Sequence, residues 1–291
     1  FDVFDEALAA AAAGTTIRVL GDVYDAGQTL ALEGLRVLGE GRDTVILRAA
    51  AGGTGLTVSA DDVELASFAL LGGATGLDVA GTVDRKIQGL VVSDLRVSAI
   101  VAPDGAALPA TGIGLRYATG AQVSGCDVQG VIGGSGATTG ATTGGAASGV
   151  LLDHALSCEV SGTTVRDLVG GAGTEAGYGG LARGIGVVTS GGSVLSSNTQ
   201  TAIQGGVGGD GSYRDGDGGK GAGVYLSASS GTVITDNTSS DVEGGAGGGA
   251  GDMAGQAQLG YGLYLEPDAL DALVSSSWHQ GEPVWFLRDA S

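Results

Sequence analysis

Short stretches in which hydrophobic and polar residues alternate recur along the chain, and a glycine opens each of them. In the segment 148–171, Gly149 precedes Val150 and Leu152, and a polar corner then leads to a second stretch around Val160. Related segments span 112–134, 184–206, 221–245 and, more loosely, 260–281. An alternation of period two predicts β-strands, and its repetition every 34 to 41 residues predicts a solenoid.

The repeat contains two or three short strands and no helix, so we expect one all-β domain that folds as a β-helix. Its turns can be aligned on one valine each: Val123, Val160, Val194, Val233 and Val274. The glycine-led strands then contribute one aliphatic residue per turn to a shared core: Leu56, Leu77, Leu115, Leu152, Val187, Val224 and Leu263. This register decides which residues share the outer surface.

The N-terminal segment has a pattern of its own. Residues 1–14 are alanine-rich and place Phe1, Phe4 and Leu8 on one helical stripe, which predicts a helix that caps the open end of the solenoid. The segment 16–49 follows with a Thr-Ile-x-Val strand, a Gly-Asp-x-Tyr turn and the run LxGEGRDTVI. This order resembles the N-terminal part of right-handed β-helix proteins of the pectate-lyase-like superfamily. The resemblance spans about 50 residues and implies a right-handed parallel β-helix, but it says little about activity.

The turns lengthen along the chain. We expect short turns over 15–99, turns with long loops over 100–281 and a final strand over 282–291. Four loops begin Gly-Gly-x-Gly, at positions 133, 170, 205 and 244, and they should project side by side. Two interpretations are open: flexible surface linkers, or an ordered layer of extended polyglycine II strands whose backbones approach because side chains are missing.

Composition and charge narrow the class of partner. The 291 residues include 59 Gly, and 13 Lys and Arg stand against 32 Asp and Glu, a net charge of −19. This charge disfavours nucleic acid and anionic membranes, and it favours cations or neutral glycans. No apolar run is long enough to insert into a membrane, and no signal peptide is visible. We interpret the chain, which begins at Phe1, as a monomeric piece of a longer secreted or surface-exposed bacterial protein.

Five polar or sulfur-bearing residues are interpreted as structural. Cys126 and Cys158 fall about 16 Å apart along aligned strands, too far for a disulfide, which predicts two free, mostly buried thiols. Asn198 and Asn237 occupy equivalent corners, with Asp127 in the same column. Stacked amides at such corners satisfy backbone groups of the turns.

The aligned strands also predict an outward column: Thr57, Asp78, Arg116, Asp153, Val188, Tyr225, Tyr264 and Trp285. Asp78, Arg116 and Asp153 would place a carboxylate on each side of an arginine, near the separation that inverting glycosidases use for an acid and a base. In the alternative interpretation the trio is an exposed ion-pair ladder. An arginine between two acids lowers both carboxyl pKa values, which suits that alternative better than a general acid.

An aromatic strip follows in the same column. Tyr225, Tyr264 and Trp285 could contact the flat face of a sugar ring and are our candidate glycan-binding residues. Such a row can equally be a stack that stiffens the sheet, or a surface covered by a neighbouring domain.

Catalytic signatures of related enzymes are sparse. Asp153 and His154 are similar to the Trp-Ile-Asp-His strand of pectate lyases, and we expect His154 to point inward as a hydrogen-bonded core residue. The polygalacturonase and pectin methylesterase motifs are missing. The chain has two histidines, His154 and His279, which is a poor supply for a metal-dependent hydrolase or for an enzyme with a catalytic triad.

A calcium site is a further open alternative. Asp210, Asp215 and Asp217 lie in one glycine-rich loop that could surround a hard cation. The loop begins like a Gly-Gly-x-Gly-x-Asp calcium repeat, but Ser212 takes the apolar position and no tandem copy follows. No other cofactor is indicated.

The sequence therefore predicts a secreted or cell-surface scaffold or adhesion module, with a polysaccharide or cell-surface glycan as its candidate partner. The alternative is a polysaccharide lyase or glycoside hydrolase that uses Asp78, Arg116 and Asp153. Fold analogy alone does not decide between them.

Overall fold

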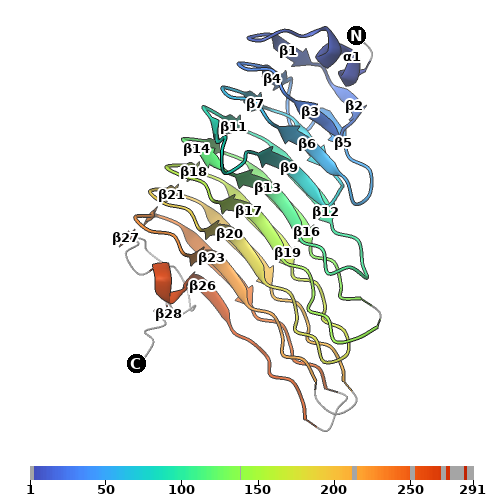
Figure 1. Cartoon of the computed structure of the whole chain (residues 1–291), viewed down its shortest axis with the longest axis vertical. Coiled ribbons are helices and arrows are strands. Elements are labelled where there is room, and N and C mark those ends of the chain that lie inside the picture. The colour runs from blue at the N-terminus through green and yellow to red at the C-terminus, as the bar shows by residue number, and fades with distance from the viewer. Residues whose placement is uncertain are drawn as a thin grey trace.

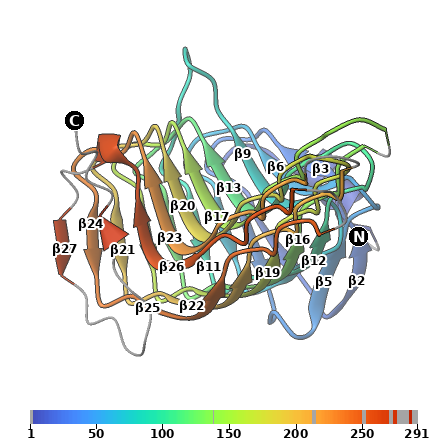
Figure 2. The same ribbon diagram turned by 90° about the horizontal axis from the view of Figure 1, so that it is seen from below.

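The structure is a computed structural model, and it describes residues 3–137, 139–211, 215–249, 253–269, 273–275 and 285–286. Three long parallel sheets, here called A, B and C, wind into one coil, and the chain visits them in that order in each turn (Figure 1). Seen from the end toward which the chain advances, this path runs anticlockwise (Figure 2). The chain is thus an all-β, right-handed parallel β-helix, as predicted.

Each sheet takes about one strand from every turn. Sheet A contains β1 (Thr16–Val19), β4 (Arg36–Gly39), β7 (Glu64–Ala66), β11 (Val91–Ser93), β15 (Gln122–Ser124), β18 (Glu159–Ser161), β21 (Val194–Ser196), β24 (Val233–Thr235) and β27 (Leu273–Ser275). Sheet B contains β2 (Asp22–Asp25), β5 (Val45–Arg48), β8 (Ala69–Leu71), β12 (Arg96–Val101), β16 (Asp127–Ile132), β19 (Thr164–Val169), β22 (Thr199–Gln204) and β25 (Thr238–Glu243).

Sheet C faces the viewer in Figure 1. It contains β3 (Gln28–Leu30), β6 (Thr54–Val58), β9 (Thr75–Ala80), β13 (Ala110–Arg116), β17 (Ala147–Asp153), β20 (Ala182–Val188), β23 (Gly221–Ser227), β26 (Gly260–Leu265) and β28 (Trp285–Phe286). A small sheet pairs β10 (Ile87–Gln88) with β14 (Ala118–Thr119), and a 3-10 helix, η1, spans Pro267–Ala269.

The helical cap is shorter than predicted. Helix α1 spans Phe4–Ala10 and ends before Ala11, whose backbone is extended, so the helix stops short of Gly14. Phe4 of this helix is buried against the first turn. Of the predicted final strand, 282–291, only β28 lies within the described residues.

The interior of sheet C consists of two aliphatic columns, not the single one predicted. One column runs Leu56, Leu77, Ile113, Val150, Ile185, Val224 and Leu263, and the other runs Val58, Val79, Leu115, Leu152, Val187, Leu226 and Leu265. All of these side chains are buried. The predicted register was therefore wrong by two residues between Leu77 and Leu115 and again between Val187 and Val224.

The anchor valines were also partly misplaced. In sheet A, Val160 pairs with Leu195, and Ile234 pairs with Val274. Val194, which was predicted to align with Val160, instead aligns with Glu159 and points outward with 38% of its surface exposed.

The corner between sheets A and B carries a buried polar column. The Nδ2 of Asn198 donates to the carbonyl of Val160 (2.8 Å) and to Oδ1 of Asn237 (2.9 Å), and its own Oδ1 accepts the backbone N–H of Thr163. The predicted amide stack is thus confirmed for Asn198 and Asn237. Asp127 is not a member, because the backbone pairing puts Cys126 in this column. Cys126 and Cys158 are both free and buried, as predicted.

The glycine-rich loops leave the coil between sheets B and C and fold back on themselves (Figure 2). We call residues 133–136, 170–174, 205–209 and 244–248 the outgoing arms, and residues 142–146, 177–181, 216–220 and 255–259 the return arms. Neighbouring outgoing arms are joined at every third residue, as where Gly205 N–H donates to Glu243 O and Gly208 N–H donates to Ala246 O. The described parts of the arms are therefore hydrogen-bonded strands rather than free linkers.

Outgoing and return arms are joined in turn by a second set of backbone bonds. Gly206 N–H donates to Gly180 O (2.8 Å), Gly219 N–H to Gly206 O (2.7 Å) and Gly245 N–H to Gly219 O (2.8 Å). The glycines are required by this closeness and not by their φ angles, none of which lies in the left-handed region. A Cβ added to Gly206 would lie 2.0 Å from the carbonyl oxygen of Gly171.

Candidate functional site

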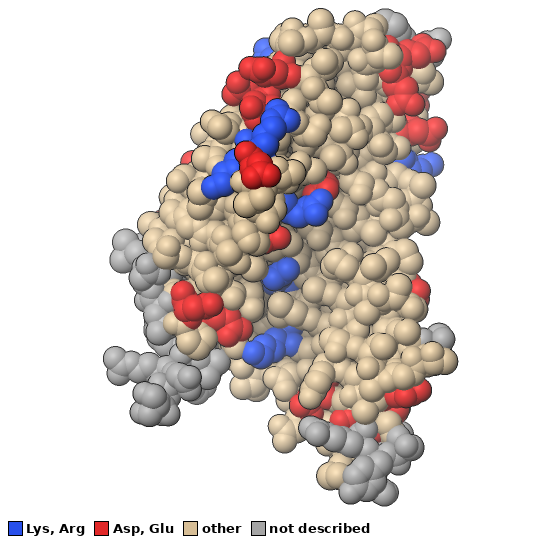
Figure 3. All heavy atoms as spheres, in the orientation of Figure 1, with Lys and Arg blue, Asp and Glu red and all other residues tan. Residues whose placement is uncertain are grey.

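The predicted site residues lie on strands of sheet C or in the loops beside it, and those whose side chains are described belong to the outer face of the sheet or to these loops. Figure 3 shows this face, on which Lys and Arg side chains form a broken row along the coil axis. Three separate groups of polar or aromatic side chains follow one another along this row, and we take them in chain order.

The first group is a closed ion pair. Arg116 donates to Asp78 through two nitrogens, Nε to Oδ1 (3.0 Å) and Nη2 to Oδ2 (2.5 Å). Asp78 stands opposite Gly114 in the register, so Arg116 reaches it diagonally across a position without a side chain. Hydrogen bonding to Asp78 raises the pKa of Arg116. Both oxygens of the Asp78 carboxylate are thus engaged by Arg116.

The second group is Asp153 with His154. Asp153 lies opposite Arg116 in the register, but its Oδ1 contacts Nδ1 of His154 (2.8 Å) instead. The ring of His154 stacks on Tyr117 with a centroid distance of 4.7 Å. The prediction of an inward His154 was wrong: its side chain is 42% exposed, because its left-handed φ of 53° places it at the corner after β17.

Arg183 follows and was not predicted. Its side chain lies flat over Gly186, where a Cβ would come within 2.6 Å of Cδ. Its Nε donates to Ser148 Oγ (2.8 Å), and its guanidinium carbon is 5.6 Å from the ring centre of Tyr225. No carboxylate pairs with it among the described residues. Burial lowers the pKa of this guanidinium, partly offset by Tyr225 and Asp153.

The third group contains the tyrosines. Tyr225 and Tyr264 are neighbours in the register and stack with centroids 5.6 Å apart and planes 6° from parallel. Lys220 lies against the ring of Tyr264 and donates to its hydroxyl (2.5 Å). Tyr264 is only 2% exposed, so the predicted exposed aromatic row is wrong at this position. The backbone of Trp285 pairs with Tyr264 as predicted.

A groove of about 390 Å³ opens beside Tyr225, between the return arms and sheet C. Tyr178, Asp217, Lys220 and Gln258 line it from the loops, and Tyr225 and Glu266 line it from the sheet. The Tyr225 hydroxyl donates to Glu266 Oε1 (3.2 Å), and burial followed by Glu266 raises the pKa of Tyr225 to about 12. Tyr178 is 51% exposed at this groove. The groove thus offers aromatic surface, an amine, carboxylates and an amide to one ligand.

The three loop aspartates are occupied by the loops themselves. Asp210 accepts the N–H of Gly249, Asp215 accepts that of Gly211, and Asp217 accepts that of Gln256, each at 2.8 Å. Across the described part of the chain, no three His, Cys, Asp or Glu side chains gather in a way that suits a metal ion.

Sequence reasoning missed Tyr178, Arg183, Lys220 and Glu266. Tyr178 and Lys220 lie in glycine-rich loops, where the alternation of period two gives no register. A usable signal was present for Arg183: it is a long side chain three residues before Gly186, a position without a side chain that Arg183 can cover.

Comparison with known proteins finds likeness in fold. No protein-family model matches the sequence, and no curated protein does. Similar solved structures include an alginate lyase from Paenibacillus sp. str. FPU-7, at 12% identity over 95% of this chain and 94% of that one, with a TM-score of 0.45. A pectate lyase is similar at 13% identity over 96% of this chain and 72% of that one, with a TM-score of 0.43. Both are parallel β-helix proteins, the architecture that the sheet order of this chain establishes by itself.

Proposed function

We propose that this chain is a rigid module of an extracellular or cell-surface protein, and that it binds a carbohydrate in the groove between the return arms and sheet C. The observation that supports this is the lining of the groove. Tyr178 and Tyr225 supply aromatic surface, and Lys220 and Gln258 supply hydrogen-bonding groups beside it. Sugar rings present an apolar face and a rim of hydroxyls, so they need both kinds of surface at once.

The rigidity belongs to the same proposal. We infer that the arms form a polyglycine II layer, in which each extended strand repeats every three residues. The three-residue spacing of the bonds between Gly205, Gly208 and the next arm supports this geometry. Because Tyr178 and Lys220 lie on return arms, an ordered layer fixes one wall of the groove before a ligand arrives, which lowers the entropic cost of binding.

Binding is tested with a panel of neutral and acidic polysaccharides by affinity electrophoresis, followed by calorimetry on the best ligand. Tyr178→Ala removes exposed aromatic surface from the groove and should weaken binding at least tenfold. Tyr117→Ala is the matched control, because Tyr117 stacks on His154 and does not line the groove. Equal affinity of Tyr178→Ala and the unchanged protein would refute the proposal, as would a failure of every polysaccharide to bind.

The alternative function is that of a polysaccharide lyase or glycoside hydrolase. The contact between Asp153 and the half-exposed His154 favours it, because a carboxylate that orients an imidazole prepares it for proton transfer. Asp78 and Arg116 act in this alternative as a structural pair beside the dyad. Incubation with the same polysaccharide panel should then release unsaturated or reducing ends, and Asp153→Asn should abolish the release. Absence of product with every polysaccharide leaves the binding module as the function.

A further inference from the structure

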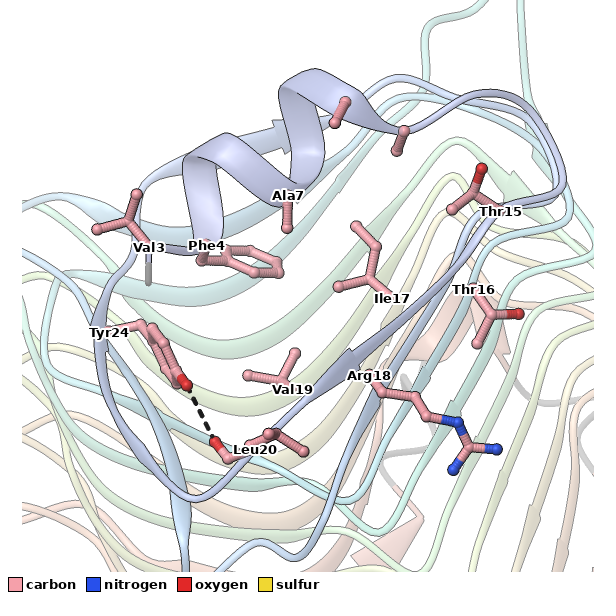
Figure 4. A pocket seen from close by; sticks show the side chains of 12 residues that line it. Val3, Phe4, Ala7, Thr15, Thr16, Ile17, Arg18, Val19, Leu20 and Tyr24 are labelled. Carbon is pink, nitrogen blue, oxygen red and sulfur yellow. Dashed lines mark hydrogen bonds between the residues drawn. The ribbon is translucent and has the colours of Figure 1, made fainter. Parts of the chain in front are cut away.

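The N-terminal end of the coil holds a cavity of about 350 Å³ between α1 and the first turn, and most of the residues that line it are apolar (Figure 4). Phe4 and Ala7 of α1 face it from one side, and Ile17 and Val19 of β1 face it from the other. Leu20 lines it as well and is 59% exposed. Helix α1 therefore covers the first turn without filling the space above β1.

Strand β1 also has one edge without a neighbouring strand, because it is the first strand of sheet A. The carbonyl of Thr15 accepts the N–H of Arg36 (2.9 Å), and the carbonyl of Val19 accepts the N–H of Glu40 (3.1 Å). The backbone groups of the odd-numbered residues of β1 therefore point toward β4. Backbone groups of successive strand residues point to opposite edges. The N–H and C=O of Thr16 and Arg18 consequently point to the open edge, and they have no hydrogen-bond partner in the described part of the chain.

Arg18 adds a charge requirement to this edge. It is the charged residue of the cavity lining, it stands opposite Leu38 in the register, and no acid pairs with it among the residues described. The next arginine on the same sheet face is paired: Arg36 of β4 stands opposite Glu64 of β7, with Nε 2.6 Å from Oε2. Sheet A thus already joins an arginine to an acid across adjacent strands, and Arg18 lacks such a neighbour on its open side.

We propose that this end of sheet A is a docking site for an extended peptide of a partner protein, which adds to β1 as a further parallel strand. The peptide carries an apolar–acidic–apolar triplet. Its two apolar side chains enter the cavity above Ile17 and Val19, and its acid pairs with Arg18. Its backbone bonds the free groups of Thr16 and Arg18, as in other cases of strand addition to a sheet edge.

The charge requirement is tested with two fluorescein-labelled peptides, Thr-Ser-Val-Glu-Val-Ser-Thr and the same peptide with Lys in place of Glu, titrated to millimolar protein by anisotropy. The Glu peptide should bind at least tenfold more tightly. Arg18→Glu should reverse this preference, since it exchanges the charge and leaves the backbone alone. Failure of both peptides to bind, or an unchanged preference in Arg18→Glu, overturns the proposal.

The edge itself is tested with Thr16→Pro, which removes an N–H that has no partner in the sheet and which an edge strand tolerates. The variant should keep its thermal midpoint and lose at least tenfold in affinity for the Glu peptide. Thr16→Ser, the control, keeps the N–H and should bind normally. Hydrogen exchange at Thr16 and Arg18 should slow when the Glu peptide binds. Full binding by Thr16→Pro, or unchanged exchange at both amides, contradicts strand addition at this edge.

Discussion

Part of the coil's interior is apolar in the first turns and polar in the last ones, whereas the two inner columns of sheet C stay aliphatic throughout. The corner column between sheets A and B runs Phe68, Leu95, Cys126, Thr163, Asn198 and Asn237. An internal column of sheet B changes in the same direction: Leu70, Val97, Val128, Val165, Gln200 and Ser239. All of these side chains are buried. The change falls at the turn that contains Thr163 and Val165 for one column, and one turn later for the other.

The two regions therefore gain stability from different sources. Burying a leucine contributes about 1.5–3 kcal/mol, whereas a satisfied internal hydrogen bond contributes about 1 kcal/mol net. The polar turns also contain the buried Nε2 of Gln200, which has no hydrogen-bond partner among the residues that the structure describes. These same turns carry the hydrogen-bonded arms, which the short turns before residue 99 lack. We infer that backbone bonding in the loops offsets a weaker interior, so the last turns should depend on their loops more than the first turns do.

The largest expected effect comes from breaking the loop layer with Gly206→Ala. The added Cβ would lie 2.0 Å from the carbonyl oxygen of Gly171. Neither atom can move without its own backbone, so one of the two arms must shift. We expect a loss of about 3 kcal/mol, the upper range for overpacking. Urea unfolding followed by hydrogen exchange should place the loss in the last turns.

Gly249→Ala is the matched control for this variant. A Cβ on Gly249 meets no atom of the described residues within 4 Å, so the stability of this variant should be unchanged. If Gly206→Ala and Gly249→Ala unfold at the same urea concentration, the loops do not support the polar turns and the inference fails.

The next effect tests the polar interior directly. Asn198→Ala removes the side-chain acceptor of the Thr163 N–H. It also removes the hydrogen bonds from Nδ2 to Val160 and Asn237. Buried groups left without partners cost about 1–3 kcal/mol, so we expect a loss of about 2 kcal/mol in urea unfolding. Ser230→Ala, at an exposed corner of a neighbouring turn, is the comparison variant and should unfold with the unchanged protein. A loss below about 0.5 kcal/mol for Asn198→Ala would mean that water replaces the amide ladder without cost.

The sequence predicted the fold, and which side chains of a strand point inward, better than it predicted the register between strands. A strand alternates with period two, so a slip of two residues keeps every side chain on its own face. Leu115 and Ile113 are both inward, and nothing in the alternation says which one lies over Leu77. The slip at Val194 has another cause: Val194 and Leu195 are both apolar, so the pattern does not choose between them.

The prediction of the candidate site was wrong partly because of the register slip and partly because some of its residues lie in loops. Once the register slipped, Arg116 appeared to stand between Asp78 and Asp153, whereas it lies beside Asp153 and pairs diagonally with Asp78. Lys220, which contacts the ring of the buried Tyr264, comes from a loop. Loop arms follow a spacing of three residues, and only the position of glycines marks it. Tyr178 could not be placed at the groove without knowing how the arms stack.

A smaller effect is expected at Cys126, where the apolar part of the corner column ends. Its Sγ donates to the Ser124 carbonyl two residues back (3.4 Å), and the hydroxyl of Thr163 donates to Ser161 in the same way (3.3 Å). Cys126→Thr should therefore change the free energy of unfolding by less than about 1 kcal/mol. Leu95→Thr, one turn earlier in the apolar region, should cost more than Cys126→Thr. Equal costs would mean that the boundary between the two regions is not sharp.

The same cysteine gives a pH dependence. Burial raises the pKa of Cys126 to about 11 from an ordinary value of 9.0. The thiol of the unfolded chain therefore ionises first, so this contribution to stability is complete below pH 9 and falls as the pH rises toward 11. In urea unfolding between pH 8 and 10.5, the free energy of unfolding of the unchanged protein should therefore fall relative to that of Cys126→Thr. Rapid alkylation of native Cys126 at pH 8 would contradict its burial.

The smallest effect is expected on the outer face, at the pair of Arg116 and Asp78. The arginine side chain is half exposed, and exposed pairs contribute about 0–1 kcal/mol. Arg116→Gln should thus lower the free energy of unfolding by less than about 1 kcal/mol, and 1 M salt should remove most of the difference because it screens exposed charges. A loss above about 2 kcal/mol that persists in salt would show that the outer face also supports the apolar turns. The contrast between the two regions would then have to include their surfaces, because the first turns would be held by more than their aliphatic interior.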